Sequence, residues 1–388
     1  MELQEVKSRD QEVQFLQVNV NLNRNTPNYI RPLDHEIRAV FDPEQNKFFR
    51  HGECSRWILV GDEGEPAGRI AAFVNKKYRT KGDDVPVGGI GFFDCINNQQ
   101  AADLLFDVAK HWLLQRGMEA MDGPINFGER DKWWGLVTEG FHEPLYGMNF
   151  NPPYYQSLFE NYGFRIFFNQ VCLGLDPRKS FPDKLVKRHD TLASDPAFSF
   201  RFIRKNELKK FAADFTTVYN KAWAGHGGAK EIRIEQTRIL FQKMKPVMDE
   251  RLIIFAYHHA EPIGMFVNLP ELNQYFKHFN GRFGLLQKIH FLFMKMTGAC
   301  KKITGIVFGI VPEFQGRGVD AYMILEVSKS IIEKTKYTSY EMQWIGDFNP
   351  KMINLAENLG ETFRSRNLVT YRYLFNRLKE FKRHPFLV

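Results

Sequence analysis

Hydrophobic and polar residues along this chain form short alternating runs that predict strands and longer periodic runs that predict helices. In the first half we expect strands at residues 14–20, 55–60, 68–75, 87–95 and 121–127, with a helix at 101–116. In the second half we expect strands at 200–203, 252–257, 263–269, 303–311, 341–348 and 368–375, with helices at 319–334 and 349–360. The mixture indicates an α/β fold.

The two halves resemble each other at three places that are almost equally spaced. Residues 65–68 (EPAG) match 261–264 (EPIG), 150–152 (FNP) match 348–350 (FNP), and 160–163 (ENYG) match 357–360 (ENLG). Matches at a nearly constant separation predict two copies of one fold. We place the boundary in the charged, Pro-containing stretch 176–195, where periodicity lapses, and expect domains at residues 1–180 and 197–388.

A glycine-rich loop lies between the predicted strand 303–311 and the predicted helix 319–334. Residues 311–320 read VPEFQGRGVD. Gly316 and Gly318 allow successive backbone N–H groups to turn toward one point, and the start of the following helix adds the positive end of its dipole. We therefore expect this loop to bind a phosphorylated ligand.

The loop resembles the Gln/Arg-x-x-Gly-x-Gly/Ala loop of the GNAT superfamily of acyl-CoA N-acyltransferases. Residues 349–360 (NPKMINLAENLG) resemble the later Asn-containing segment of that superfamily, and residues 88–163 resemble bacterial tandem GNAT-like proteins of unknown substrate. The resemblance implies two GNAT-like domains in tandem, each a mixed central sheet flanked by helices. It also implies a set of acyl-CoA-binding residues: Ile310, Val311, Gln315, Gly316, Arg317, Gly318, Val319, Asp320 and Asn349.

Asp320 departs from the resemblance, since the superfamily carries a small residue there. A carboxylate about 5 Å from a pyrophosphate would cost on the order of 3 kcal/mol at an effective dielectric near 20. We expect Asp320 to point away from the ligand as a first-turn acid favoured by the helix dipole; the alternative is a loop that no longer binds. In the first copy, Asn97 to Ala101 contain no glycine, so we expect that copy to lack the phosphate loop and the chain to bind one coenzyme A.

The candidate catalytic residues come from three segments of the second copy. GNAT-type transfer requires deprotonation of an amine, an oxyanion donor and reprotonation of a thiolate. The resemblance assigns the oxyanion donor to the amide of Ile310 or Val311. Candidate bases are Glu341 and Asp347 on one strand, and His226 in the glycine-rich sequence GHGG.

The tyrosine that often acts as the acid in this superfamily is absent, because Ala356 occupies its position. Tyr371 and Tyr373 on the last strand are candidate substitutes, although alternating aromatic residues on a strand also serve packing. Each candidate also has a purely structural interpretation. Glu341 and Asp347 can be solvated residues at a strand edge, His226 can belong to a surface loop, and the two tyrosines can be packing residues.

Composition restricts the cellular setting. The chain has 388 residues, 44% of them hydrophobic and 25% charged, with a net charge of +8 and four unpaired-looking cysteines. These values predict a cytoplasmic globular protein without disulfides or metal sites, whose positive field favours an anionic ligand such as coenzyme A. The sequence contains no HExxH, CxxC, GxSxG or Walker motif and no block of basic residues typical of nucleic-acid binding.

An insertion in the second half, residues 271–302, is rich in phenylalanine and lysine. Read as a helix from Leu285, it places five apolar residues on one face: Leu285, Ile289, Leu292, Phe293 and Met296. We expect this face to dock onto the protein, with packing against the first copy as the plain interpretation. The alternatives are a lid over the acyl group or a basic helix at a membrane surface. No transmembrane segment is predicted.

Together these patterns predict an N-acyltransferase that moves an acyl group from acyl-CoA, with acetyl-CoA favoured, to a small-molecule or peptide amine by direct attack. Two alternatives stay open. One is a Fem-type aminoacyl or peptidyl transferase that uses charged tRNA, and the other is a non-catalytic acyl-CoA-binding module.

Overall fold

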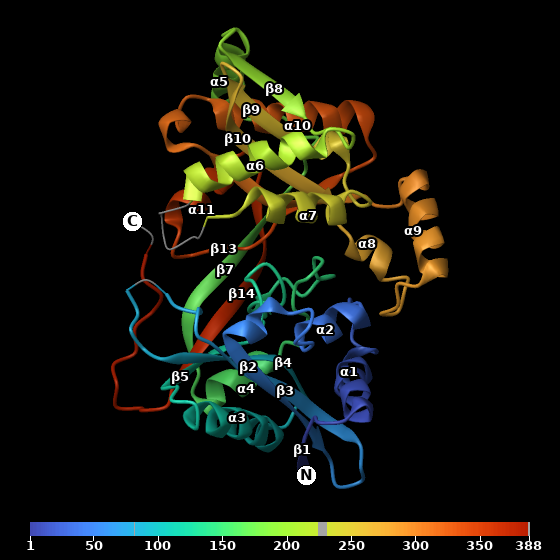
Figure 1. Cartoon of the computed structure of the whole chain (residues 1–388), viewed down its shortest axis with the longest axis vertical. Helices are drawn as coiled ribbons and strands as arrows, with labels where there is room; N and C mark the ends of the chain where they lie inside the picture. The colour runs from blue at the N-terminus through green and yellow to red at the C-terminus, as the bar shows by residue number, and fades with distance from the viewer. Residues whose placement is uncertain (81, 224–230, 387–388) are drawn as a thin grey trace.

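The chain forms one continuous mixed sheet with helices on both faces in a computed structural model that describes residues 1–80, 82–223 and 231–386 (Figure 1). The strand order is β1-β2-β3-β4-β5-β14-β7-β12-β11-β10-β9-β8, with β6 pairing with β14 and β13 with β7. The two ends of this sheet belong to the two halves of the chain. The tandem arrangement predicted from the repeated sequences therefore exists as one shared sheet.

The first half contains seven strands and five helices in its described residues. The strands are β1 (Glu2–Glu5), β2 (Gly52–Val60), β3 (Pro66–Asn75), β4 (Val87–Cys95), β5 (Ala120–Gly123), β6 (Leu136–Glu139) and β7 (Arg165–Leu175). The helices are α1 (Arg9–Asn23), α2 (Asp34–Val40), α3 (Gln99–Leu114), α4 (Tyr155–Tyr162) and α5 (Asp183–Ala193).

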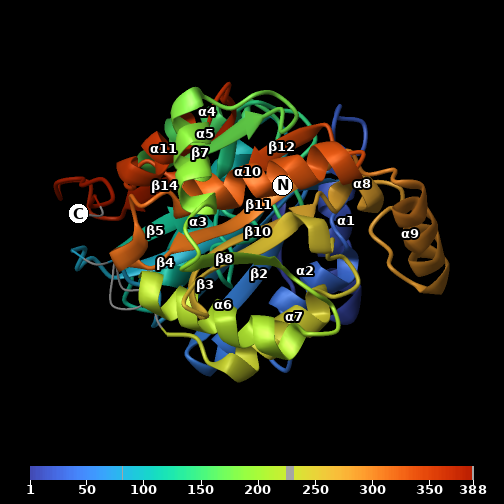
Figure 2. The same cartoon turned by 90° about the horizontal axis from the view of Figure 1, so that it is seen from above.

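The second half repeats the pattern of strands and helices. Its strands are β8 (Phe198–Phe202), β9 (Ile253–His258), β10 (Glu261–Pro270), β11 (Lys302–Ile310), β12 (Ser339–Met342), β13 (Ile345–Gly346) and β14 (Phe363–Leu374). Its helices are α6 (Leu208–Trp223), α7 (Ile234–Met244), α8 (Asn273–Phe276), α9 (Leu285–Thr297), α10 (Val319–Lys334) and α11 (Pro350–Glu357). Helices α6 and α7 cover one face of this end of the sheet, and α10 with α5 covers the other (Figure 2).

The last strand of each half enters the other half. Strand β14 pairs with β5, where Tyr371 lies opposite Gly123, and β7 pairs with β12, where Leu175 lies opposite Tyr340. Strands β7 and β14 also pair with each other along most of their length. Because each core contains a strand from the other half, residues of the last strand lie in the first half's core.

Two expectations for local structure are wrong. Residues 14–20 belong to helix α1, not to a strand, because Ser8 and Gln11 form a capping box that starts a helix and buries Phe15 and Val18 against the sheet. Residues 183–193, expected to be an irregular linker, form α5. Leu185, His189 and Leu192 of α5 are buried at helical spacing.

Candidate functional site

The glycine loop after β11 contains a nest, a run of backbone amides without hydrogen-bond acceptors among the described residues. Gly316 and Gly318 both have positive φ, 75° and 95°, and Gly318 is the N-cap of α10. Among the hydrogen bonds of the described residues, the six consecutive amides from Gly316 to Ala321 meet no acceptor. Unpaired amides at the N-terminus of a 16-residue helix present partial positive charge to an anion.

A gap opens in the sheet beside this loop. Strands β11 and β12 run parallel only from Lys302 to Gly305, and the amide of Gln343 makes the last link, 3.0 Å to the carbonyl of Gly305. Beyond that point β12 leaves β11, and β13 pairs with β7 instead. Within the part of the chain that the structure describes, the second half of β11 therefore has one edge without a strand partner.

The two backbone amides expected to stabilise the oxyanion, those of Ile310 and Val311, point to opposite sides of β11. The amide of Val311 donates to the carbonyl of Ile263, 2.8 Å away on β10, so it is already engaged. Because successive amides of a strand point to opposite sides, the amides of Ile310 and Phe308 face the gap. Sequence reasoning did not select Phe308, since a backbone donor carries no side-chain signal.

Asp320 is buried under α5, where it forms an ion pair. Its carboxylate Oδ1 lies 2.5 Å from Nη2 of Arg188, and its side chain is 8% exposed. The backbone oxygen of Arg188 also lies 3.1 Å from the position that a Cβ on Gly318 would take. Helix α5 thus covers Gly318 to Asp320, while Gly316 and Arg317 stay exposed.

The other expected acyl-CoA-binding residues support the loop or the following segment. Gln315 donates from Nε2 to the carbonyl of Ile310, 3.0 Å away, which ties the loop to the end of β11. Val319 is fully buried. Arg317 lies over the ring of Phe314. Asn349 caps α11 by accepting from the amide of Met352 at 3.2 Å, so its side chain serves the helix.

Glu341 lies in a buried ion-pair cluster. Its carboxylate accepts from Arg366 Nε at 2.7 Å, from Lys302 and from the hydroxyl of Ser365. Burial would raise the pKa of Glu341, but His142, whose Nε2 lies 3.7 Å from the carboxylate, and the charge of Arg366 outweigh burial and hold the pKa far below its usual range. A carboxylate stabilised in this way is a weak proton acceptor, which argues against Glu341 as the base.

Two of the remaining catalytic candidates, Tyr371 and Tyr373, lie in the first half's core and not at the gap. Tyr371 is fully buried, packs in the first half's core and donates to Glu160 at 2.8 Å; burial raises the pKa of this phenol well above its ordinary value. Tyr373 lies in the same core. Asp347 accepts from Asn169 at 2.8 Å and from the tail residue Arg383. His226 lies outside the described residues.

The first half lacks the nest at the corresponding position. After β4, the side chain of Asn98 caps α3 by accepting from the amide of Ala101 at 3.0 Å. The amides of Ile96 and Asn98 also have carbonyl acceptors. The amide of Ala101 is already bonded to the Asn98 side chain, so it is not available to a phosphate. This loop therefore has fewer free amides with which to bind an anion.

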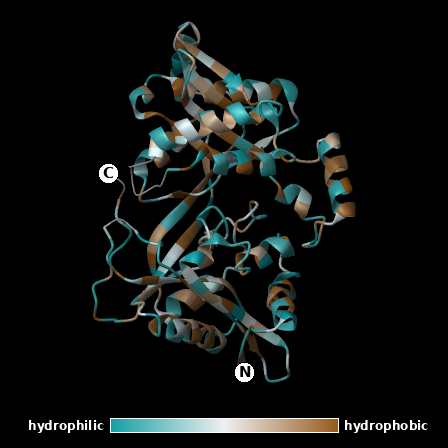
Figure 3. Ribbon diagram, in the orientation of Figure 1, coloured by the Kyte–Doolittle hydropathy of each residue, from teal (hydrophilic) through white to brown (hydrophobic). Residues whose placement is uncertain are grey.

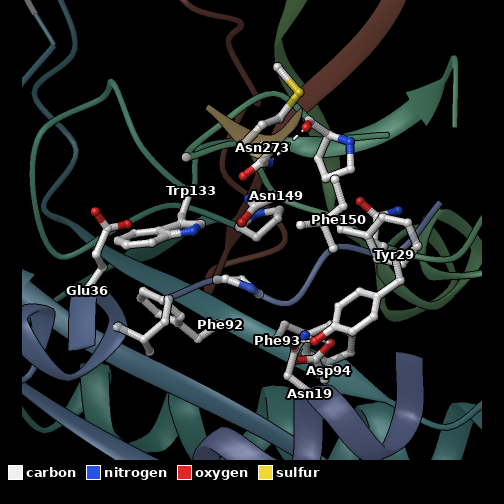
Figure 4. Close-up of a pocket in the computed structure, with 18 of the residues that line it drawn as sticks. Asn19, Tyr29, Glu36, Phe92, Phe93, Asp94, Trp133, Asn149, Phe150 and Asn273 are labelled. Atoms are coloured by element: carbon white, nitrogen blue, oxygen red, sulfur yellow. Dashed lines mark hydrogen bonds between the residues drawn. The ribbon is translucent and has the colours of Figure 1, made fainter. Parts of the chain in front are cut away.

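A pocket lies where the two halves meet (Figure 4). Aromatic residues make up part of its walls, and Figure 4 labels Phe92, Trp133 and Phe150 there beside the polar residues Glu36 and Asn149. Asn273 of α8 reaches it from the second half and donates from Nδ2 to the carbonyl of Pro144 at 2.9 Å. These walls suit an apolar group, and sequence reasoning missed them because they come from distant segments.

The pocket carries a buried carboxylate on β4. Asp94 is 2% exposed and accepts from Arg69 at 2.7 Å, from Asn19 at 3.0 Å and from Asn23 at 3.0 Å. The hydroxyl of Tyr29 donates to Asn19 at 2.7 Å, and burial raises the pKa of Tyr29 well above its ordinary value. The positive charge of Arg69 balances the negative charge of Asp94. The hydrogen-bonded residues around Asp94 therefore form a polar part of the pocket lining without net charge.

Comparison with solved structures identifies the fold. A tandem GNAT protein from the clavulanic acid biosynthesis pathway superposes with a TM-score of 0.54 at 10% sequence identity, covering 97% of this chain and 99% of that one. The chain has the tandem GNAT fold. The glucosamine N-acetyltransferase region of a fungal multi-domain GH3 β-N-acetylglucosaminidase also superposes at 0.54 and 12% identity. That match covers 96% of this chain and 38% of the fungal protein.

Two curated proteins are similar in sequence over most of the chain. Bacterial ceramide synthase of Caulobacter vibrioides is 25% identical over 362 residues, covering 92% of this chain and 93% of that protein. Protein YghO of Escherichia coli K12 is 22% identical over 352 residues, covering 89% and 88%. No family model matches the chain. The chain thus shares its fold with N-acetyltransferases.

Within residues 1–80, 82–223 and 231–386, none of the helices has the length and apolar character that crossing a bilayer requires. The same residues contain no group of three or more His, Cys, Asp or Glu side chains placed to hold a metal ion. The cysteines are free, and three of the four are buried.

Proposed function

We propose that this protein is an acyl-CoA-dependent N-acyltransferase whose loop from Gln315 to Asp320 binds the pyrophosphate of coenzyme A. The observation that carries the proposal is the run of six amides from Gly316 to Ala321 that meet no acceptor among the described residues, at a helix N-terminus beside a gap in the sheet. An extended thiol arm that leaves this nest along β11 would pass the free edge of the strand. The Fem-type alternative has no comparable need for such a nest.

The reaction joins an amine to the acyl group in one displacement. The amine nitrogen attacks the thioester carbonyl, the new C–N bond forms, and the C–S bond breaks to release the coenzyme A thiolate. The amides of Phe308 and Ile310 face the gap and are the donors placed to stabilise the oxyanion. The ammonium proton leaves to solvent or to a base outside the Glu341 cluster, whose carboxylate is too weak a base.

We infer that the acceptor is an amine with a long hydrocarbon chain. The relative from Caulobacter vibrioides is named a ceramide synthase, and a ceramide is a long-chain amino alcohol acylated on nitrogen. The aromatic pocket of Figure 4 has walls suited to such a chain and a polar floor at Asp94 suited to its hydroxyl groups. This inference concerns the acceptor. The donor stays open between acetyl-CoA, which the sequence-based prediction favours, and a long-chain acyl-CoA, so both are tested.

The decisive experiment incubates the purified chain with acyl-CoA and a long-chain amino alcohol. Mass spectrometry should detect the amide, and a thiol reagent should detect one free coenzyme A for each amide formed. Acetyl-CoA, a long-chain acyl-CoA and charged tRNA are compared as donors. Amide formation from charged tRNA alone would favour the Fem-type alternative. Coenzyme A binding without transfer to amines of any chain length would favour the non-catalytic module.

The binding site itself is tested by calorimetry with coenzyme A. Gly318→Val should abolish binding, because Gly318 has φ of 95° and a Cβ would lie 3.1 Å from the backbone oxygen of Arg188. Gly64→Val is the matched control: Gly64 has φ of 85°, lies in the exposed β2–β3 turn and has open space around it. We expect one coenzyme A per chain, and two would show that the first half also binds.

A further inference from the structure

Helix α9 has an apolar stripe that faces solvent. Six residues at helical spacing make up this stripe, with exposures from 55% to 87%: Leu285, Leu286, Ile289, Leu292, Phe293 and Met296. Figures 1 and 2 show α9 at the outer edge of the molecule, and Figure 3 shows that it is largely hydrophobic. Such a contiguous exposed apolar surface marks an interaction site.

The opposite face of α9 holds the helix to the protein. Phe291 and Met294 are buried at 4% and 8% exposure, and the ring of Phe291 packs against Tyr275 of α8 at 5.0 Å. The sequence-based prediction, that the face containing Leu285 and Met296 packs against the protein, is therefore wrong. The face containing Phe291 and Met294 packs there instead. The stripe is therefore a second apolar face, which the described part of the chain leaves uncovered.

Positive charge surrounds the stripe. From residue 272 to residue 302 the sequence contains no Asp or Glu, but it contains six Lys or Arg residues. Arg282, Lys288 and Lys301 form no ion pair with any described residue. Lys288 is exposed on α9 beside the stripe. An apolar face flanked by unpaired cations matches the acyl region and the phosphates of an anionic lipid surface.

A second copy of the chain fits this surface less well. A two-fold dimer through α9 would place the same patch on both partners, so Arg282 and Lys288 would face their own copies with no acidic residue from the segment to pair with them. The 13 residues of α9 span about 20 Å, too short to cross a bilayer. The helix suits a position within the membrane surface.

We propose that α9 docks this protein onto anionic bilayers, with its stripe of residues 285–296 inserted at the level of the headgroups. The segment that carries α9 also reaches the pocket of Figure 4 through Asn273 and Phe276 of α8. The membrane contact and the aromatic pocket therefore share one structural segment. Binding to lipid needs no catalytic turnover, so this proposal stands or falls separately from the proposed reaction.

The test is co-sedimentation of the full chain with vesicles. Vesicles of equal parts phosphatidylcholine and phosphatidylglycerol should bind the protein, vesicles of phosphatidylcholine alone should bind it more weakly, and added salt should weaken binding. Leu286→Ser/Phe293→Ser should lower the affinity at least about tenfold without loss of folding, because both side chains are more than 60% exposed. The matched control is Ile239→Ser/Leu240→Ser, at exposed positions of α7, which should bind as the parent does.

Two further measurements make the outcome decisive. Phe293→Trp places a fluorophore in the stripe, and its emission should shift to the blue with anionic vesicles if the stripe enters lipid. Arg282→Glu/Lys288→Glu should remove the preference for phosphatidylglycerol. The proposal is overturned if the parent chain does not bind anionic vesicles or if the double serine variant binds as tightly. It is also overturned if analytical ultracentrifugation shows a parent dimer that the double serine variant converts to a monomer.

Discussion

Arg188→Met should weaken coenzyme A binding although Arg188 lies outside the phosphate loop. Its guanidinium pairs with the carboxylate of Asp320 at 2.5 Å, and Asp320 belongs to the first turn of α10 next to the nest. In the variant, the negative charge of Asp320 loses its partner. An incoming pyrophosphate then meets an uncompensated carboxylate.

The magnitude follows from the charges and their surroundings. One unit charge about 5 Å from a phosphate at an effective dielectric near 20 costs about 3 kcal/mol. Asp320 is 8% exposed, so solvent screens it little, although water that enters beside the methionine will reduce the penalty. Allowing for that screening, we expect the dissociation constant to rise roughly 10- to 100-fold, since about 1.4 kcal/mol corresponds to tenfold.

Calorimetry at fixed ionic strength measures the effect in four proteins: the parent, Arg188→Met, Asp320→Asn and the double variant. Asp320→Asn should bind about as well as the parent, since Arg188 then lacks its counter-ion but stays cationic near the anion. The double variant should recover most of the affinity lost in Arg188→Met, because it carries neither charge. Circular dichroism on each protein shows whether α10 and α5 remain folded.

Equal affinity of the parent and Arg188→Met would refute the reasoning, because it would show that Asp320 does not lie within electrostatic reach of the ligand. An equally poor double variant would also refute it. In that case the arginine would matter for packing of α5 over Gly318, and not for neutralising Asp320.

Other predictions concern two buried catalytic candidates, Glu341 and Tyr371. Glu341→Gln should lower the free energy of unfolding by about 3 kcal/mol in urea denaturation, because Arg366, 1% exposed, loses its charge partner. Folding holds the pKa of Glu341 far below its usual range, so its contribution is fully present above the unfolded pKa of about 4.3 and is lost only as pH falls from there toward the folded pKa. The stability difference between the parent and Glu341→Gln should therefore begin to shrink below about pH 5 and should still be measurable at about pH 3. A loss of turnover in Glu341→Gln with unchanged stability would restore its role as base. Tyr371→Phe should cost about 1 kcal/mol from the lost hydrogen bond to Glu160 and leave kcat unchanged; a tenfold fall in kcat at full stability would contradict this.

Local sequence predicted the turn at Gly316 and Gly318 and the helix that follows it, because the requirements of both are local; binding of a phosphate there stays a prediction. Gly316 and Gly318 adopt positive φ, which glycine adopts without strain, and the apolar spacing of residues 319–334 gives α10 over the same range. The repeated EPAG and EPIG segments lie at the start of β3 and β10, in equivalent hairpins. For the same reason the absence of the loop in the first half could be read from Asn97 to Ala101.

The catalytic candidates could not be placed from sequence, because their surroundings come from distant strands. Tyr371 and Tyr373 follow the phosphate loop in sequence, but β14 pairs with β5 and carries both into the first half's core. Glu341 reads as a charged residue on a strand, and only the approach of Arg366 and Lys302 makes it an ion-pair centre. Local alternation of residue types contains no information about such pairings.

Sequence by itself determined the repeat, the glycine nest and the positive charge of the 272–302 segment, because each depends on neighbouring residues along the chain. Tertiary structure decided which charge neutralises Asp320, which half receives β14 and which face of α9 remains exposed. The periodicity of α9 offers two apolar faces of similar character, and packing against α8 selects Phe291 and Met294 for the interior. Burial is set by the surfaces that meet in three dimensions, and a helical pattern alone leaves that choice open.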